Sequence, residues 1–264
     1  MEISKKTFNR FEKWEKKYGI EYFMNDYAII SYPKAGRTWL RMIMAKLLDG
    51  EGYDTSRYEM MPAFHFSPDE MKEHHNCDGL KIIFLHRHLG DVMVSSYAER
   101  TSSFRSGMRF EKENIPIGLF LQEGNLGLIA AANWNIKWFA NLGTCNIEDY
   151  RIITYEEMTE DTFKVIKKIT NFMNLDIEDD KIINAIEYSK FENMKEIEHG
   201  KGKNFLKKYK GNFGSSPGRV RKGKVGGYVN HFDEQDLRFI HEVQSIHDNC
   251  PEVKHLKERE INVN

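Results

Sequence analysis

A short apolar segment followed by a tight turn constrains the fold of this chain more than any other feature. Residues 27–30 (Tyr-Ala-Ile-Ile) predict a buried strand, which ends at Pro33. Gly36 lies in the turn, and apolar residues recur at helical spacing from Leu40 to Leu47. A strand, a turn and a helix in this order direct backbone N–H groups to one point, where the helix dipole also favours negative charge. The segment therefore predicts an anion site.

The turn also carries two side chains that suit a phosphate group. Lys34 adds a cation inside the turn, and Thr38 adds a hydroxyl at the start of the helix. The common nucleotide loop, G-x-x-x-x-G-K-[ST], is absent because Lys34 precedes Gly36 instead of following it. The segment therefore predicts a phosphate-binding loop of another type.

The order Tyr-Pro-Lys-x-Gly-x-Thr-Trp at residues 32–39 resembles the loop with which sulfotransferases hold PAPS (3′-phosphoadenosine 5′-phosphosulfate). Ala35 and Arg37 depart from the pattern, since the cytosolic enzymes usually carry Ser and Thr there. The resemblance implies that six residues bind the donor: Lys34, Ala35, Gly36, Arg37, Thr38 and Trp39. Lys34 would also act in catalysis, by neutralising the bridging and terminal oxygens of the phosphosulfate.

A second apolar segment, residues 81–86, predicts a strand that ends in a cation at Arg87. Asp91 is predicted to cap the helix that follows. The spacing of Arg87, Asp91, Ser95 and Tyr97 resembles the sulfotransferase segment R-x-x-x-D-x-x-x-S-x-Y, in which Arg and Ser bind the 3′-phosphate. An Arg at a strand end and a Ser one helical turn beyond the cap can share one phosphate. An Arg–Asp ion pair at the start of the helix is the alternative.

Two further segments resemble the family's adenine-contacting elements. Tyr155-Glu156-Glu157-Met158 follows a predicted strand at residues 149–154, and residues 189–195 match S/T-x-F-x-x-M-K. The resemblance implies that Tyr155, Ser189 and Phe191 contact the adenine side of the nucleotide. A boundary tyrosine beside a helix cap is the alternative interpretation of Tyr155.

Residues 201–232 contain basic residues but neither Asp nor Glu. Residues 200–220 are rich in Gly, Lys and Ser without periodicity, which predicts a mobile basic loop. Arg221, Lys222 and Gly223 resemble the start of the sulfotransferase R-K-G-x-x-G-x-x-K stretch, although Val229 replaces its last lysine. The resemblance implies that these three residues bind the 3′-phosphate. A basic run of this kind can otherwise be solvated or face nucleic acid.

His65 is the candidate catalytic base. It lies 22 positions before Arg87, within residues 53–80, which are predicted to be irregular. This place resembles that of the family's catalytic histidine, whereas the surrounding Phe-His-Phe-Ser-Pro does not match the usual Thr-His-Leu-Pro motif. A packed core histidine is the alternative. A metal site at residues 74–77 (His-His-Asn-Cys) is rejected, because adjacent histidines point apart on a regular backbone.

The composition excludes several classes of partner and compartment. The formal net charge of −1 selects neither a nucleic acid nor a membrane surface. The three cysteines are far apart, which suits a reducing compartment. Residues 1–17 lack the apolar core of a signal peptide, and the apolar stretch at 117–132 is too short and polar to span a bilayer. We therefore expect a cytoplasmic protein without a transmembrane segment.

The resemblance extends from Tyr32 to Gly227 and implies a three-layer α/β/α fold with a mainly parallel central sheet. We expect a single domain over residues 1–264, with a helical segment at 1–25 packed on it. The implied reaction is transfer of a sulfuryl group from PAPS to a hydroxyl or amine of a small-molecule, glycan or lipid acceptor. The product nucleotide would be PAP (3′-phosphoadenosine 5′-phosphate), and no metal would be needed.

Two alternatives to this enzyme stay open at this point. One is a module that binds PAPS or PAP without catalysis. The other is an ATP-dependent P-loop kinase, which would want a Gly-Lys-Ser/Thr loop and an acidic strand end for magnesium; here the second strand ends in His86-Arg87. The acceptor and the oligomeric state also stay open.

Overall fold

Four parallel strands form the central sheet, in the order β2-β1-β3-β4. The computed structural model describes residues 27–49, 63–74, 80–102, 115–146, 149–196 and 223–261. The strands are β1 (Tyr27–Ser31), β2 (Ala63–Phe64), β3 (Lys81–His86) and β4 (Tyr150–Thr154). All three pairings between neighbouring strands are parallel. β1 is buried along its whole length, as its apolar sequence predicts.

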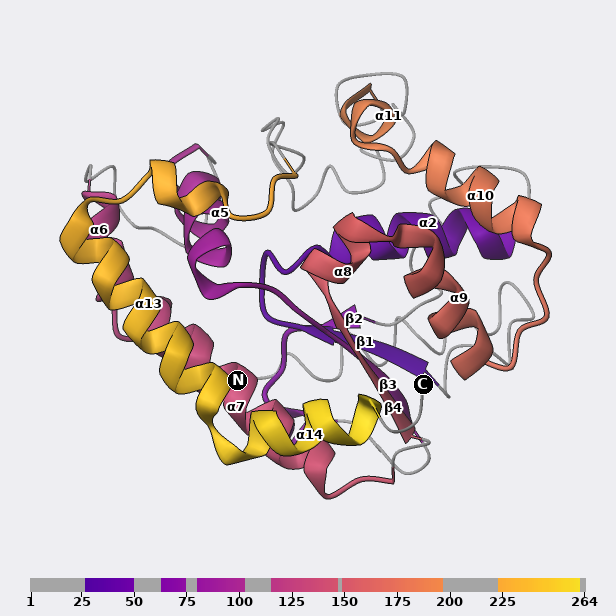
Figure 1. The fold of residues 1–264 in the computed structure, drawn as a ribbon, viewed down its shortest axis with the longest axis horizontal. Coiled ribbons are helices and arrows are strands. Elements are labelled where there is room, and N and C mark those ends of the chain that lie inside the picture. Colours follow the sequence, from indigo (N-terminus) through magenta and orange to yellow (C-terminus); the bar gives the residue numbers. More distant parts are fainter. Residues whose placement is uncertain are drawn as a thin grey trace.

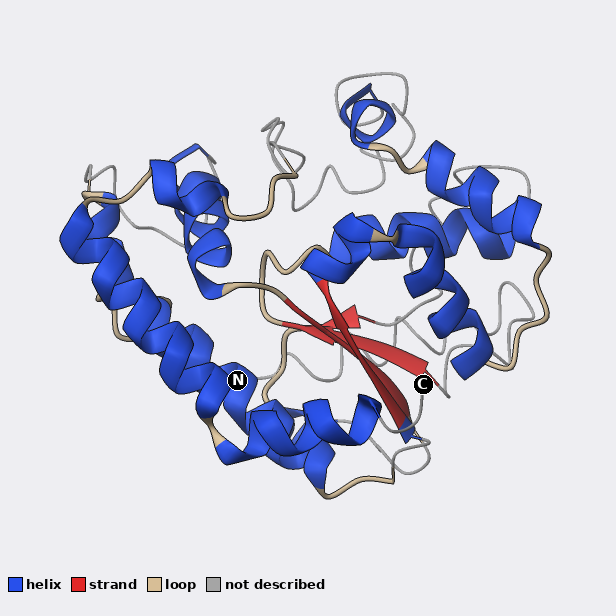
Figure 2. Cartoon of the chain, in the orientation of Figure 1, coloured by secondary structure: helices blue, strands red, loops and turns tan. Residues whose placement is uncertain are grey.

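Helices lie on both faces of this sheet (Figures 1 and 2). In chain order they are α2 (Arg37–Asp49), α4 (Pro68–His74), α5 (Leu89–Ser102), α6 (Ile117–Leu121), α7 (Leu128–Gly143), α8 (Tyr155–Glu160), α9 (Thr162–Phe172), α10 (Asp179–Tyr188), α11 (Phe191–Glu196), the 3₁₀ turn η3 (Gly227–Asn230), α13 (Glu234–Asn249) and α14 (Pro251–Ile261). Figure 1 shows α2, α8, α9 and α10 on one side of the sheet and α7, α13 and α14 on the other.

The side chains of the strands alternate between two apolar cores. Ile29 and Ile83 point into the core formed with α2, α9 and α10. Their neighbours Ile30 and Phe84 point into the opposite core, which includes residues of α7 and α14. Because successive strand side chains face opposite sides of a sheet, a continuous apolar strand requires cover on both faces. The predicted three-layer α/β fold is confirmed.

The carboxyl ends of the strands meet at one edge of the sheet, because all four strands run in the same direction. The register pairs Ile30 with Phe64, and Ser31 with Leu85. It also pairs His86 with Thr154. The segments that follow these strands therefore begin next to one another, at the edge where open α/β sheets bind their ligands.

Three features differ from the sequence predictions or lie beyond them. β2 falls inside residues 53–80, which were expected to be irregular. α14 follows α13 directly and begins with Pro251, a residue that suits the first helical position because its missing N–H has no partner there. The expected helix at 1–25 and the basic loop at 200–220 lie outside the described residues. Within the part of the chain that the structure describes, no helix combines the length and apolarity needed to cross a membrane.

Candidate functional site

The turn between β1 and α2 adopts a backbone shape that few side chains allow. Lys34 has φ of 72° and Gly36 has φ of 103°, both in the left-handed region. A Cβ on Gly36 would collide with the ring of Tyr155, so this position requires glycine both for its backbone and for its neighbour. The carbonyl of Gly36 accepts hydrogen bonds from the N–H groups of Trp39 and Leu40, which start α2.

Lys34 makes contacts through both its side chain and its backbone. Its Nζ lies 3.0 Å from Oε1 of Glu99 on α5. Its carbonyl oxygen accepts a hydrogen bond of 3.5 Å from Nη1 of Arg87. The turn after β1 is thereby joined to the segment after β3. The neighbouring Ala35 is buried in the apolar core, while Thr38 is half-buried in the first turn of α2.

His65 follows β2 directly and reaches the end of β1. Its Nδ1 lies 2.6 Å from the carbonyl oxygen of Ser31. Since a carbonyl only accepts, Nδ1 carries the proton and the lone pair of a neutral imidazole is on Nε2. Although part of the side chain is exposed, the pKa of His65 is lowered from 6.5 to about 3, first by desolvation and then by the charge of Arg37. The exposed surface of His65 does not fit the alternative of a packed core histidine.

Arg87 connects the segment after β3 with three other parts of the site. Its Nη2 donates to the carbonyl of Lys224 at 2.9 Å and lies 3.7 Å from the Asp91 carboxylate. Its guanidinium carbon lies 4.0 Å above the ring of Tyr155, a cation–π contact. The Nε of Arg87 is buried and has no hydrogen-bond partner among the described residues. The contacts of Nη1, Nη2 and the guanidinium face hold this arginine in place.

Asp91 anchors the segment 223–230 to the start of α5. Its carboxylate accepts hydrogen bonds from the backbone N–H groups of Gly226 at 2.8 Å and Tyr228 at 3.1 Å. The ring of Tyr228 stacks on His88 at a centroid distance of 4.6 Å. Asp91 was expected to cap the helix; it instead lies in the first turn of α5 and holds a segment more than 130 residues away in sequence.

Tyr155 is the first residue of α8, and a capping box fixes that helix start. The Thr154 hydroxyl accepts from the Glu157 N–H, and the Glu157 carboxylate accepts from the Thr154 N–H. The ring of Tyr155 meets Trp39 edge-on at a centroid distance of 5.8 Å. A Cβ on Gly223 would lie 3.5 Å from both Tyr155 Oη and the Phe191 ring. One part of the site is therefore formed by Gly223 and three aromatic rings, those of Trp39, Tyr155 and Phe191.

The remaining predicted residues divide into those that the structure describes and those that it does not. Ser189 ends α10, and its buried Oγ has no hydrogen-bond partner among the described residues. Ser95 is half-buried on α5, one helical turn after Asp91. Arg221 and Lys222 lie outside the described residues. Within the described ranges, no group of three or more His, Cys, Asp and Glu side chains could hold a metal ion.

Glu99 was not predicted from the sequence as a residue of this site. The signal was the four-residue spacing of Asp91, Ser95 and Glu99, which places all three on one face of α5. The motif used to interpret α5 ended at Tyr97, so the next residue of this face was not considered.

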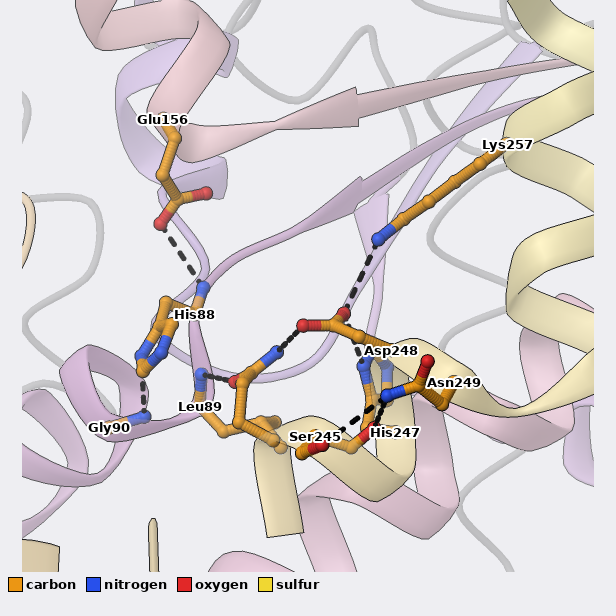
Figure 3. A network of polar contacts seen from close by, with 10 residues as sticks. His88, Leu89, Gly90, Glu156, Ser245, His247, Asp248, Asn249 and Lys257 are labelled. Carbon is orange, nitrogen blue, oxygen red and sulfur yellow. Dashed lines mark hydrogen bonds and ion pairs between the residues drawn. The ribbon is translucent and has the colours of Figure 1, made fainter. Parts of the chain in front are cut away.

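A network of polar contacts joins the turn between β3 and α5 to neighbouring helices (Figure 3). The Glu156 carboxylate accepts from the His88 N–H at 3.1 Å. The side-chain oxygen of Gln244 accepts from the Leu89 N–H at 2.9 Å, and its nitrogen donates to Asp248 at 3.0 Å. Lys257 on α14 also contacts Asp248. This network fixes the turn that carries Arg87 to α8 and to the two C-terminal helices.

Comparison with known proteins gives a family for this arrangement. Residues 54–257 match the family model of the sulfotransferase domain, which is more than half of the chain. Sulfotransferase 2A1 of Rattus norvegicus is 30% identical over 152 residues, which cover 58% of this chain and 51% of that protein. This chain therefore matches about half the length of that relative. The amine sulfotransferase of Oryctolagus cuniculus is 23% identical over 247 residues, covering 81% of this chain and 78% of the relative.

Solved structures support the same fold. A mouse sulfotransferase crystallised with PAP superposes with a TM-score of 0.65 at 21% identity, covering 90% of this chain and 89% of that one. Retinol dehydratase, in complex with androsterone and the inactive cofactor PAP, superposes with a TM-score of 0.63 at 15% identity. The superposition covers 91% of this chain and 85% of the retinol dehydratase chain.

Proposed function

Because this chain belongs to the family of PAPS-dependent sulfotransferases, we propose that it transfers a sulfuryl group from PAPS to an acceptor hydroxyl or amine. A new bond forms between the acceptor atom and sulfur, the bond from sulfur to the bridging oxygen breaks, and PAP leaves with that oxygen. The acceptor gives its proton to a base. One observation carries the proposal: Lys34, His65 and Arg87 follow three different strands, and contacts of the turn at 31–34 hold them together.

The turn after β1 binds the phosphosulfate end of the donor. Lys34, the backbone at Gly36, and the side chains of Arg37 and Thr38 supply the positive charge and hydrogen-bond donors for its oxygens. Sulfuryl transfer resembles phosphoryl transfer, in which alignment and charge stabilisation provide most of the catalysis. The charge that develops on the departing phosphate is neutralised by Lys34.

The aromatic and basic residues around Gly223 bind the nucleoside and its 3′-phosphate. Trp39, Tyr155 and Phe191 surround the adenine. The Ser189 hydroxyl, which has no hydrogen-bond partner among the described residues, also contacts the adenine side. The Nε of Arg87, which has no hydrogen-bond partner among the described residues, fits a ligand oxygen, because a buried donor is costly to leave without an acceptor. Ser95, Arg221, Lys222 and Gly223 complete the 3′-phosphate site, which selects PAPS over ATP.

His65 accepts the acceptor proton through Nε2. The hydrogen bond to Ser31 fixes the tautomer that leaves this nitrogen unprotonated. Because its pKa is lowered to about 3, the imidazole of His65 is neutral at physiological pH but is a weak base. The negative charge of a bound donor beside Arg37 and Lys34, whose charges lower the pKa, would raise it toward the range that suits proton transfer. The place of His65 beside the Lys34 turn supports an enzyme over a module that only binds nucleotide.

Small molecules are the proposed acceptors. The relatives include an amine sulfotransferase and a 3-beta-hydroxysteroid sulfotransferase, which together favour an amine or an alicyclic hydroxyl. We propose a cytoplasmic location, in keeping with Cys145 and Cys250, which form no disulfide among the described residues.

Calorimetric titration with PAP, ADP and ATP–magnesium tests the donor site. We expect a clear preference for PAP over both other nucleotides, and a loss of that preference in Arg87→Ala and in Arg221→Ala. Arg238→Ala, which removes an exposed arginine from α13, serves as the matched control and retains PAP binding. Preference for ATP–magnesium would revive the kinase and reject the proposal.

A further inference from the structure

Lys34, the cation that the proposed reaction uses, forms an ion pair with Glu99. The two charged atoms are 3.0 Å apart, and the side chains are only 15% and 26% exposed. A hydrogen bond between two charged groups at this distance is stronger than a neutral one, and partial burial reduces its screening by salt. The Glu99 carboxylate thus holds the Lys34 side chain in this structure.

The position of Glu99 makes it a neighbour of the donor's anionic oxygens. It lies one helical turn beyond Ser95 and two beyond Asp91, on the face of α5 that meets the turn after β1. An ammonium group has three N–H donors, so its geometry alone allows a carboxylate and a phosphosulfate oxygen together. The carboxylate and the phosphosulfate nevertheless repel each other at contact distance, and a partly buried place strengthens that repulsion. The two anions therefore compete for Lys34.

We infer that Glu99 is a positioning residue that holds Lys34 while the donor is absent and releases it to the phosphosulfate when the donor binds. The inference rests on the proposed role of Lys34. Through the ion pair, Glu99 keeps the Lys34 side chain next to α5 and supports a turn whose backbone has φ of 72° at a residue with a side chain. After the reaction, the same carboxylate competes with PAP for Lys34 and thereby speeds product release.

The carboxylate also lies close enough to affect His65. The negative charge of Glu99 raises the pKa of His65, whereas Arg37 and Lys34 lower it. A carboxylate that has released Lys34 still raises the pKa of the imidazole that takes up the acceptor proton. Breaking the ion pair and binding the donor therefore both change the charge around Lys34, Glu99 and His65.

Titration of PAP into four proteins tests this exchange: the wild type, Glu99→Gln, Lys34→Ala and the double variant. Glu99→Gln keeps the shape of the side chain and removes its charge. We expect it to bind PAP about 2- to 10-fold more tightly than the wild type, or about 0.4–1.4 kcal/mol. The gain is expected to be larger when Lys34 is present than in the Lys34→Ala background, because only the first case includes the broken ion pair.

A kinetic measurement separates this role from a structural one. With PAPS as donor, Glu99→Gln should lower the KM for PAPS and, where PAP release limits turnover, lower kcat as well. A purely structural loss would raise KM or inactivate the protein instead. Glu99→Asp, which keeps the charge on a shorter side chain, should bind PAP with an affinity between those of the wild type and Glu99→Gln. It provides the same test if the Gln variant does not fold.

Glu234→Gln is the matched control, since it removes one carboxylate from an ion pair with Arg238 on the exposed face of α13. It should leave the affinity for PAP unchanged. Equal affinity of wild type and Glu99→Gln would overturn the inference, and so would an equal gain in both Lys34 backgrounds, which would indicate simple charge repulsion. A wild type that prefers ATP–magnesium to PAP would instead reject the proposed function on which the inference rests.

Discussion

His65 and His86 have similarly lowered pKa values in two different surroundings. Both follow or end a strand at the carboxyl edge of the sheet, and in both the pKa is lowered from 6.5 to about 3, chiefly by desolvation. His65 has an exposed surface, donates Nδ1–H to Ser31, and lies near cations of the donor turn. His86 is buried against the rings of Phe84 and Phe139, and its Nε2 has no partner among the described residues.

The comparison shows that a lowered pKa does not by itself identify a catalytic base. Burial lowers the pKa of any histidine, because the imidazolium loses its hydration. What distinguishes His65 is its geometry: a fixed tautomer and a neighbouring Lys34, at the end of the sheet where a ligand can bind. His86 shares the electrostatic signature and lacks access.

The largest expected effect is on turnover in His65→Ala. Removal of a general base costs about 10²–10⁴-fold in rate, so kcat should fall within that range while PAP affinity holds. The lost hydrogen bond to Ser31 costs only about 1 kcal/mol of stability. Initial rates with PAPS and calorimetry with PAP provide the measurement. Unchanged turnover would reassign the base.

His86→Leu should have the opposite profile, with kcat within about threefold of the wild type and altered acid stability. The folded His86 has the lower pKa, so the unfolded chain binds more protons below pH 6.5. Stability therefore falls as the pH drops from 6.5 toward 3, by up to about 1.4 kcal/mol per pH unit for one such group. Chemical unfolding at pH 7, 6 and 5 should show a shallower decline in His86→Leu.

The surroundings of His86 affect how this experiment is interpreted. His247, Lys257 and Asp248 lie near enough to influence the pKa of His86, and burial lowers the pKa of His88 in the same direction. The decline should therefore become shallower without disappearing. His255→Gln, which removes an exposed histidine from α14, is the matched control and should retain the decline of the wild type. A decline in His86→Leu as steep as in the wild type would show that His86 does not contribute.

Asp248→Asn removes a carboxylate that lies near the buried His86. It should lower the free energy of unfolding by about 1 kcal/mol at pH 7 and leave kcat nearly unchanged. Burial raises the pKa of Asp248, but hydrogen bonds from His247 and Gln244 and the charge of Lys257 outweigh it and hold the pKa well below its usual range. The contribution is present above the unfolded pKa and is lost as the pH falls toward the folded one. Asp179→Asn, in an exposed pair with Lys167, should cost less. A larger loss of kcat than of stability would contradict the supporting role.

The smallest expected effect is a titration shift on nucleotide binding. PAP places negative charge beside Arg37 and Lys34, whose positive charge lowers the pKa of His65. The pKa of His65 should therefore rise when PAP binds, while that of His86 stays the same. Imidazole nitrogen NMR of the free and PAP-bound protein measures both. Equal shifts of the two histidines would indicate a general change in the fold.

The sequence predicted those parts of the fold and site that depend on local order. Residues 27–30 gave the first strand, and the motifs around Arg87 and Tyr155 predicted which segments follow strands. Parallel pairing then places these segments at one edge. β2 was missed because two paired residues, Ala63 and Phe64, are too short to show periodicity.

Contacts across long separations were beyond the sequence analysis. The Lys34–Glu99 pair and the bonds from Gly226 to Asp91 depend on how α5 packs against two other segments. No local pattern encodes that packing. The same limit applies to His86. Its apolar strand predicted that the adjacent strand residues are buried, but not that His86 lies near His247 on α13, 161 positions later. The roles of Ser95, Ser189, Arg221 and Lys222 stay predictions.

The contact between Gly36 and Tyr155 restricts how this chain can diverge. Because the tyrosine ring occupies the space of a glycine Cβ, an alanine at position 36 needs a smaller residue at 155 as well as a strained backbone. Gly90 and Tyr228 form a similar couple, in which an added Cβ would lie 2.7 Å from the ring. Position 36 should therefore stay glycine even beside a smaller residue at 155, because its φ of 103° remains. Gly90 has no positive φ, so only the Tyr228 ring excludes a side chain there. A library that randomises positions 90 and 228 together should recover folded variants with a side chain at 90 that the single-site library at 90 does not contain.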